Sequence, residues 1–260
     1  MRFGICDSNL DRVATAAAAG ADYVELAVSG NLMPLEPDEV WEPVRQQIMA
    51  LPLKAEAFNN FFPGAVRVTG PEVDWAKVEA YASKAIQRAA MVGGKVMVVG
   101  SSGARNVPDG FSWDEAWAQL RHLFQMMGPI AAKWGITVVI EPLRKQESNI
   151  INLVTEGLRM MREVNHPNIK ALADFYHMDE LGEPLEHLLD AGPHLGHVHV
   201  ADTGRFRPGS GVYPYPIFFR YLKQVGYDQR ISMENRWDYD HFQSEVQDSL
   251  RFLREQWAKA

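Results

Sequence analysis

The chain has 260 residues, of which 47% are hydrophobic and 23% charged, an ordinary composition for a globular protein. Its formal net charge of −7, from 26 basic and 33 acidic residues, argues against nucleic acid or an anionic membrane as the main partner. The single cysteine, Cys6, excludes an internal disulfide and a cysteine-rich zinc site, and it fits a reducing compartment.

The amino-terminal segment lacks the features of a signal peptide or a membrane span. Asp7 and Asp11 stand where a signal peptide would have its apolar segment. The small-residue run ATAAAAGA, residues 14–21, is too short and too weakly apolar to cross a bilayer. We therefore expect a soluble, cytoplasmic protein.

Short apolar runs alternate with helical patterns along the whole chain. A continuous apolar or β-branched run, such as residues 136–140, is typical of a strand buried on both faces of a parallel sheet. Among the helical patterns, one opens on Asp74 and closes on Gly93–Gly94, and another opens on a capping box over Ser112–Glu115. The expected strands are Arg2–Cys6, Tyr23–Ala27, Leu53–Phe58, Val96–Gly100, Thr137–Glu141, Ala171–Asp174, Gly196–Val200 and Ile231–Glu234.

Eight strand–helix units in 260 residues match the size and rhythm of a (β/α)₈ TIM barrel. No linker or low-complexity segment interrupts them, so we predict a single α/β domain over residues 1–260. A doubly wound sheet would also alternate strands and helices, but it usually has a glycine-rich turn after its first strand. This chain has DSNLDR there, residues 7–12, which favours the barrel.

Four successive strands end on side chains that can bind a metal. The fifth ends on Glu141, the sixth on Asp174 with His177 just beyond, the seventh carries His199, and the eighth ends on Glu234. The intervals between the four strand ends are 33, 25 and 35 residues, each about one strand–helix unit. Because chemistry in a TIM barrel lies at the carboxyl ends of the strands, these side chains are expected to share one rim.

Each of these residues has another explanation when taken alone. Glu141 could be a solvated loop residue, and Asp174 could cap a helix. His197 lies two residues before His199 and faces the same side of its strand, so one of the two could be a core histidine. Together, two glutamates, one aspartate and one histidine suit an octahedral divalent ion such as Mn²⁺, Mg²⁺ or Co²⁺, whereas zinc usually takes more nitrogen or sulfur ligands.

Four motifs in the carboxyl-terminal half carry a resemblance to a known family. They are VIEPLRKQESNIINLV (139–154), ADFYHMDE (173–180), LGHVHVADTGRFRPGSG (195–211) and ISMENRW (231–237). In this order they resemble the sugar isomerase/epimerase superfamily of xylose isomerase-like TIM barrels. The likeness is greatest to the ketose 3-epimerases of the tagatose/allulose type.

The resemblance implies a metal site and an acid–base pair. By motif, Glu141, Asp174, His199 and Glu234 would bind one divalent metal ion, with Mn²⁺ as the first candidate and Mg²⁺ or Co²⁺ as alternatives. In such epimerases the two glutamates also exchange protons with the substrate. The resemblance thus assigns two roles to each glutamate.

The resemblance also implies residues that hold the substrate. Glu147, His177 and Arg205 match positions that bind the carbonyl and the neighbouring hydroxyl of the sugar. The chain departs from the family pattern in three places. Arg144 stands where asparagine is common, MDELGEP (178–184) replaces the usual acidic continuation after His177, and Phe206 stands where a basic residue is frequent. These departures concern the identity of the substrate more than the chemistry.

A pair of opposed carboxylates suits proton transfer next to a carbonyl. That reaction requires a base within hydrogen-bond reach and an electrophile that stabilises the developing ene-diolate charge. Glu141 and Glu234 would reach a sugar from opposite sides, so we predict metal-dependent ketose 3-epimerisation in carbohydrate metabolism. The same pair could move a proton between adjacent carbons, as in an aldose–ketose or hydroxypyruvate-type isomerase. The expected partner is a sugar or sugar-derived small molecule, without nucleic acid or membrane, and a homo-oligomer is left open.

Two other classes of protein are disfavoured. An endonuclease IV-like DNA repair enzyme shares the barrel but needs further histidines for a trinuclear zinc cluster. The segments EAFNNF (56–61) and ADTGRF (201–206) contain none, and the acidic balance opposes DNA binding. A non-catalytic sugar-binding protein would not need two opposed acids at a metal.

Four other features carry weaker predictions. Glu25, in the second strand, could bind a sugar hydroxyl or pair with a lysine. The turn Gly100–Gly103 could cradle a phosphate with its backbone N–H groups, and the arginines after the seventh strand, Arg205 and Arg207, could bind an anionic substrate. Trp113 could form part of an aromatic wall for a sugar ring.

Overall fold

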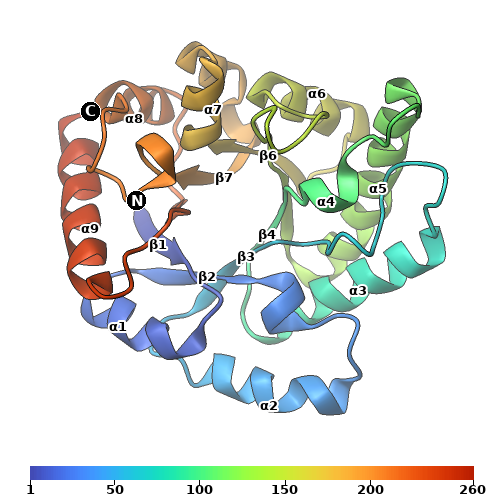
Figure 1. Cartoon of the computed structure of the whole chain (residues 1–260), viewed down its shortest axis with the longest axis horizontal. Helices are drawn as coiled ribbons and strands as arrows, with labels where there is room; N and C mark the ends of the chain where they lie inside the picture. The colour runs from blue at the N-terminus through green and yellow to red at the C-terminus, as the bar shows by residue number, and fades with distance from the viewer.

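Eight parallel strands close into a barrel in which each strand pairs with the next along the chain and β8 pairs with β1 (Figure 1). The computed structural model describes all of residues 1–260. The predicted (β/α)₈ barrel fold is confirmed. The strands are β1 (Arg2–Cys6), β2 (Tyr23–Ala27), β3 (Ala55–Asn59), β4 (Val96–Val99), β5 (Thr137–Ile140), β6 (Ile169–Asp174), β7 (Leu195–Val200) and β8 (Arg230–Met233).

Helices surround the barrel and cover the outer face of its sheet (Figure 1). Two predicted helix starts are confirmed: Asp74 Oδ1 accepts a hydrogen bond from the Lys77 N–H, and Ser112 Oγ accepts one from the Glu115 N–H. The helices are α1 (Val13–Ala18), α2 (Asp38–Met49), α3 (Trp75–Met91), α4 (Ser102–Arg105), α5 (Trp113–Trp134), α6 (Val154–Val164), α7 (Phe175–Leu181), α8 (Tyr215–Gln224) and α9 (Phe242–Lys259). None of these helices is both long enough and apolar enough to cross a membrane.

Three of the predicted strand ends lie one residue beyond the regular strands: Gly100 after β4, and the two glutamates at the rim. Glu141 follows β5 and Glu234 follows β8. Each nevertheless continues the ladder by one backbone hydrogen bond, since the Glu141 N–H donates to Val99 O at 3.2 Å and the Glu234 N–H donates to Val200 O at 2.9 Å. The sheet therefore holds both glutamates firmly at the rim.

The interior of the barrel is filled by side chains and forms its own small core. Gly4 makes room for this packing, because a Cβ at that position would collide with the ring of Tyr23. The filled interior confines the chemistry to the carboxyl-terminal rim. The six buried residues of this inner core are Tyr23, Ala57, Val96, Val98, Val139 and Leu172.

Candidate metal centre

Four side chains from the carboxyl ends of β5 to β8 meet at one point of the rim. Glu141, Asp174, His199 and Glu234 each offer a ligand atom, and these atoms lie within 4.8 Å of one another. His199 Nδ1 lies 3.0 Å from Glu141 Oε1, 3.6 Å from Glu234 Oε2 and 4.0 Å from Asp174 Oδ2. The structure thus brings together all four residues that the strand ends pointed to.

Three carboxylates in so small a buried volume repel one another. Burial, and then the charge of Glu234, raises the pKa of Glu141. Burial would also raise the pKa of Glu234, but His199 and Arg205 outweigh it and lower that pKa to about 2. A divalent cation would relieve this repulsion, and three carboxylates with one imidazole are a donor set that suits a hard divalent ion. The residues present therefore fit a metal.

A buried carboxylate fixes the orientation of the histidine. Glu25 is fully buried, and its Oε1 lies 3.0 Å from His199 Nε2. Its Oε2 lies 2.8 Å from His197 Nε2 and accepts a hydrogen bond from Ser232 Oγ at 2.5 Å. When His199 donates its Nε2–H to Glu25, the lone pair of Nδ1 faces the other three carboxylates, as a metal ligand requires.

Neither sequence expectation for Glu25 is met. It is the middle residue of β2, and its side chain points into the barrel beneath the four-ligand cluster, where it binds histidines instead of a lysine or the substrate. The signal that could have revealed its inward orientation, though not its partners, was alternation along two strands. Residues two apart share a face, so Tyr23 and Glu25 both point inward, as do His197 and His199.

A glycine makes room for Glu141. A Cβ on Gly100, just after β4, would overlap Oε2 of Glu141. The carbonyl oxygen of Glu141 also accepts a hydrogen bond from Nη1 of the buried Arg105 at 2.7 Å. The neighbouring Ser101 Oγ accepts a hydrogen bond from the Phe62 N–H at 2.9 Å. The turn at residues 100–103 thus supports Glu141 and the packing of a neighbouring loop. None of these contacts supports the hypothesis that the turn binds a phosphate.

His177 presents an unused donor beside the four ligand candidates. Its Nδ1 accepts a hydrogen bond from the Arg144 N–H at 3.3 Å, so the neutral ring carries its proton on Nε2. That Nε2 is buried without a hydrogen-bond partner and lies 3.5 Å from Asp174 Oδ2. An unpaired buried N–H next to the cluster is available to a substrate oxygen.

Arg205 lies between two carboxylates at the edge of the site. Its Nη2 is 2.5 Å from Glu234 Oε2, and its Nη1 is 3.4 Å from Glu147 Oε1. Arg205 has φ of 62°, a left-handed conformation that is uncommon for a residue other than glycine. Glu147 is in turn 2.8 Å from Arg144 Nε. Arg205, rather than the adjacent Arg236, is therefore the ion-pair partner of Glu234.

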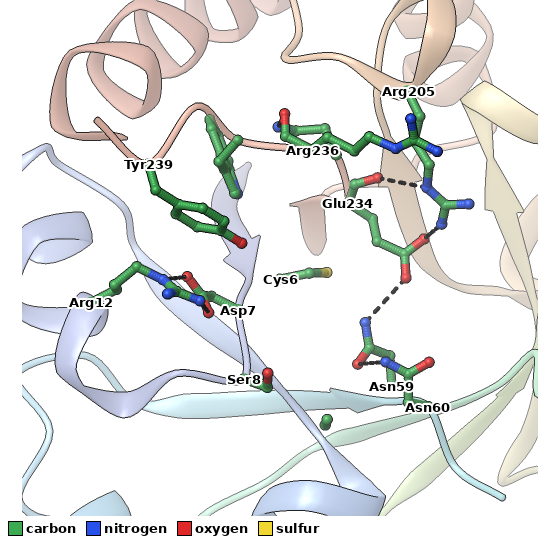
Figure 2. Close-up of a pocket in the computed structure, with 13 residues that line it drawn as sticks. Cys6, Asp7, Ser8, Arg12, Asn59, Asn60, Arg205, Glu234, Arg236 and Tyr239 are labelled. Atoms are coloured by element: carbon green, nitrogen blue, oxygen red, sulfur yellow. Dashed lines mark hydrogen bonds and ion pairs between the residues drawn. The ribbon is translucent and has the colours of Figure 1, made fainter. Parts of the chain in front are cut away.

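A cavity of about 410 Å³ opens beside the four-ligand cluster (Figure 2). Glu234 is the only one of the four ligand candidates that lines it. Trp113 does not line it but stacks on Trp117 with 5.1 Å between ring centroids, so it forms no wall of this cavity. The lining residues are Cys6, Asp7, Ser8, Arg12, Ala27, Asn59, Asn60, Arg205, Glu234, Asn235, Arg236, Trp237 and Tyr239.

The barrel and the cluster at its rim define a TIM-barrel protein with a candidate metal site. Within that class, the chain belongs to the family described as xylose isomerase-like TIM barrel, whose sequence profile matches residues 13–256. Characterised proteins similar to this chain include the L-ribulose 3-epimerase of Methylomonas sp. (strain DH-1), 30% identical over 91% of this chain and 79% of that protein. The 3-dehydro-D-guloside 4-epimerase of Escherichia coli (strain K12) is 31% identical over 50% of this chain.

Solved structures of similar proteins agree with the barrel over its whole length. A D-allulose 3-epimerase from Methylomonas sp. in complex with D-allulose has a TM-score of 0.84 and 25% identity, covering 98% of this chain and 97% of that one. A D-psicose 3-epimerase with D-tagatose from Clostridium cellulolyticum H10 has a TM-score of 0.87 at 20% identity, covering 99% of each chain. The sequence match to the E. coli relative spans 50% of that protein's length.

Proposed function

We propose that this protein is a divalent-metal-dependent sugar epimerase that inverts the carbon next to a ketose carbonyl, with C3 as the reacting carbon. The observation that carries the proposal is the placement of Glu141 and Glu234. They reach the same buried point from β5 and β8, with Oε atoms 3.0 Å and 3.6 Å from His199 Nδ1. Two carboxylates that flank a substrate can remove a proton from one face and return it to the other.

The metal ligands would be Glu141, Asp174, His199 and Glu234, and Mn²⁺ is the preferred ion, with Mg²⁺ or Co²⁺ as alternatives. A bound divalent ion would supply electrophilic stabilisation for the negative charge that develops on substrate oxygens. Glu25 would hold His199 in the tautomer that binds it.

Residues at the edge of the site would position the sugar. His177 would donate its free Nε2–H to a substrate oxygen, and Arg205 would donate from a guanidinium already aligned by Glu234 and Glu147. Glu147 would accept a hydrogen bond from a neighbouring hydroxyl. Together these contacts would keep the reacting carbon between Glu141 and Glu234, which is the positioning that proton transfer requires.

The relatives support the chemistry more closely than the particular sugar. Both an L-ribulose 3-epimerase and a 3-dehydro-D-guloside 4-epimerase, by their names, invert a carbon next to a carbonyl. The site therefore supports the class of reaction, and the similarity to these relatives supports a ketose as the substrate. We also propose a role in carbohydrate metabolism in the cytoplasm, because a chain whose single cysteine, Cys6, is free fits a reducing compartment.

Turnover in deuterium oxide tests the proposal. The Mn²⁺-loaded protein, assayed on a panel of ketoses, should place deuterium at the inverted C3. Label at a neighbouring carbon with an aldehyde product would instead identify an aldose–ketose isomerase. Turnover without solvent label would favour hydride transfer or a single base shielded from solvent. A metal content near one ion per chain is expected, whereas a content near three would favour the nuclease class.

Two variants test the acid–base pair itself. Glu141→Gln and Glu234→Gln keep the size and one coordinating oxygen of each side chain but remove its basic site. Each should lose at least the roughly 10²-fold that general acid–base catalysis contributes. Metal-loaded Gln variants that retain wild-type rates would refute the assignment.

A further inference from the structure

The cavity extends well beyond the four-ligand cluster. From Glu234 and Arg205 it reaches across to the loops after β1 and β8, where Asp7, Arg12 and Tyr239 form its far side (Figure 2). Its volume of about 410 Å³ lies within the range of roughly 300–1,000 Å³ that is typical of pockets enclosing ligands of drug size. Only one of its ends can hold the reacting carbons, because only Glu234 joins it to the cluster.

The far side of the cavity is a fixed and electrically balanced wall. Arg12 donates from Nε and Nη2 to the two carboxylate oxygens of the buried Asp7, at 2.6 Å each. The same guanidinium lies 4.2 Å from the centroid of the Tyr239 ring. Such a forked pair holds both side chains in one orientation and leaves no net charge between them.

Several polar groups in this part of the cavity are free to bind a ligand. Arg236 and Tyr239 are exposed, and their side chains form no hydrogen bond or ion pair within the chain, nor does Ser8 Oγ. Asn60 Nδ2 has only a long contact of 3.4 Å with Asn59 Oδ1. These groups include both donors and acceptors, and a sugar hydroxyl can use both because it donates one hydrogen bond and accepts others.

We propose that this part of the cavity is an outer subsite that binds a second sugar unit, joined to the ketose at the end remote from its carbonyl. The proposal rests on the proposed function and names its substrate class: a ketose-terminated disaccharide in place of a free ketose. The outer subsite consists of Asp7, Ser8, Arg12, Asn60, Arg236 and Tyr239.

An anionic group at the same place fits the observations less well. Of the two arginines in the outer subsite, Arg12 is already paired with Asp7, so only Arg236 is an unpaired cation. The wall formed by Arg12 and Asp7 carries no net charge, so it would not attract an anion either. A neutral, hydroxylated unit avoids both difficulties.

Two sugars that share one reacting end test the outer subsite. D-Fructose is the free ketose, and isomaltulose carries glucose on O6 of fructose, away from C2 and C3. With Mn²⁺-loaded full-length protein in deuterium oxide, kcat/KM for label uptake at C3 should be at least about ten-fold higher for isomaltulose. Arg236→Ala should lower the isomaltulose-to-fructose ratio of kcat/KM by roughly ten-fold, the effect of losing one hydrogen bond from a charged donor.

Matched variants distinguish recognition of a neutral sugar unit from recognition of an anionic group. Arg220→Ala removes an exposed arginine of α8 that has no ion pair and lies outside the cavity, and it should leave the ratio unchanged. Arg236→Gln keeps neutral donors and should retain most of the ratio. A preference for fructose 6-phosphate over isomaltulose that is lost in Arg236→Gln would overturn the proposal in favour of an anion site.

The failure of this proposal can be told apart from failure of the proposed function. If fructose takes up label but isomaltulose is no better, or Arg236→Ala leaves the ratio unchanged, the outer subsite is refuted while the epimerase assignment stands. If neither sugar takes up label, calorimetric titration of both sugars into the Mn²⁺-loaded protein decides. Tighter binding of isomaltulose that weakens in Arg236→Ala supports the subsite, and equal affinities refute it.

Discussion

Glu25 Oε1 lies 3.0 Å from His199 Nε2, across the imidazole ring from the carboxylates that face Nδ1. Two histidines hold the Glu25 carboxylate in turn: burial alone would raise its pKa, but His199 and His197 lower it below its ordinary value. Glu25 therefore remains ionised at the bottom of the site. A carboxylate that fixes the tautomer of a metal-ligating histidine raises the basicity of that ligand.

Replacement of this carboxylate should weaken metal binding. We expect Glu25→Gln to lower Mn²⁺ affinity by roughly 10- to 100-fold, the usual effect of losing the partner of a ligating histidine. Titration followed by electron paramagnetic resonance would measure it. Glu79→Gln, an exposed glutamate of α3 without an ion pair, is the control and should bind Mn²⁺ as the wild type does. Equal affinities in the two variants would contradict the role of Glu25.

Asp174 has two separable roles. Its Oδ1 caps α7 by accepting hydrogen bonds from the Tyr176 and His177 N–H groups, whereas its Oδ2 faces the cluster. Asp174→Asn can keep an oxygen at the cap while removing the charge. Metal affinity should therefore fall by at least about ten-fold with a change of only a few tenths of a kcal/mol in the free energy of unfolding of the metal-free protein. An unchanged affinity would remove Asp174 from the metal site.

Arg205 should affect catalysis through its forked geometry. Arg205→Lys keeps a positive charge but cannot contact Glu234 and Glu147 at once in the way that the guanidinium does. We expect a loss of about 1.5–3 kcal/mol in transition-state stabilisation, read from kcat/KM on a ketose. Arg207→Lys, in the same loop but paired with Glu245 outside the site, should keep wild-type kinetics. If Arg205→Lys is equally active, the loop does not position the substrate.

Gly100 should tolerate no side chain. In Gly100→Ala the new methyl group would displace the Glu141 carboxylate, so we expect weaker Mn²⁺ binding and an overpacking cost of about 1–3 kcal/mol in the free energy of unfolding. Gly30→Ala is the control, because a Cβ at that position meets no atom within 4 Å. Thermal unfolding of both variants with and without Mn²⁺ would compare them. Wild-type metal stabilisation in Gly100→Ala would show that Glu141 can move freely.

The sequence determined the barrel and the rim at which chemistry gathers. Buried parallel strands show up as short apolar runs, and a closed barrel brings every strand's carboxyl end to one edge. For that reason the sequence alone is enough to group the four ligand candidates, although they are spread over 94 residues from 141 to 234. They are Glu141, Asp174, His199 and Glu234. Position along a strand is a local property of the sequence, and it was enough to predict which side chains share the rim.

Tertiary structure alone decided how these residues are supported and what lies beside them. Glu25 and His199 are separated by 174 positions along the chain, and no local pattern reveals that their side chains meet inside the barrel. Gly100 shows the same limit, because its need for a bare backbone comes from a glutamate on the neighbouring strand. The cavity between Glu234 and Arg12 depends on the paths of two loops. Loop paths follow from packing and side-chain pairing across the fold, which hydrophobic periodicity does not encode.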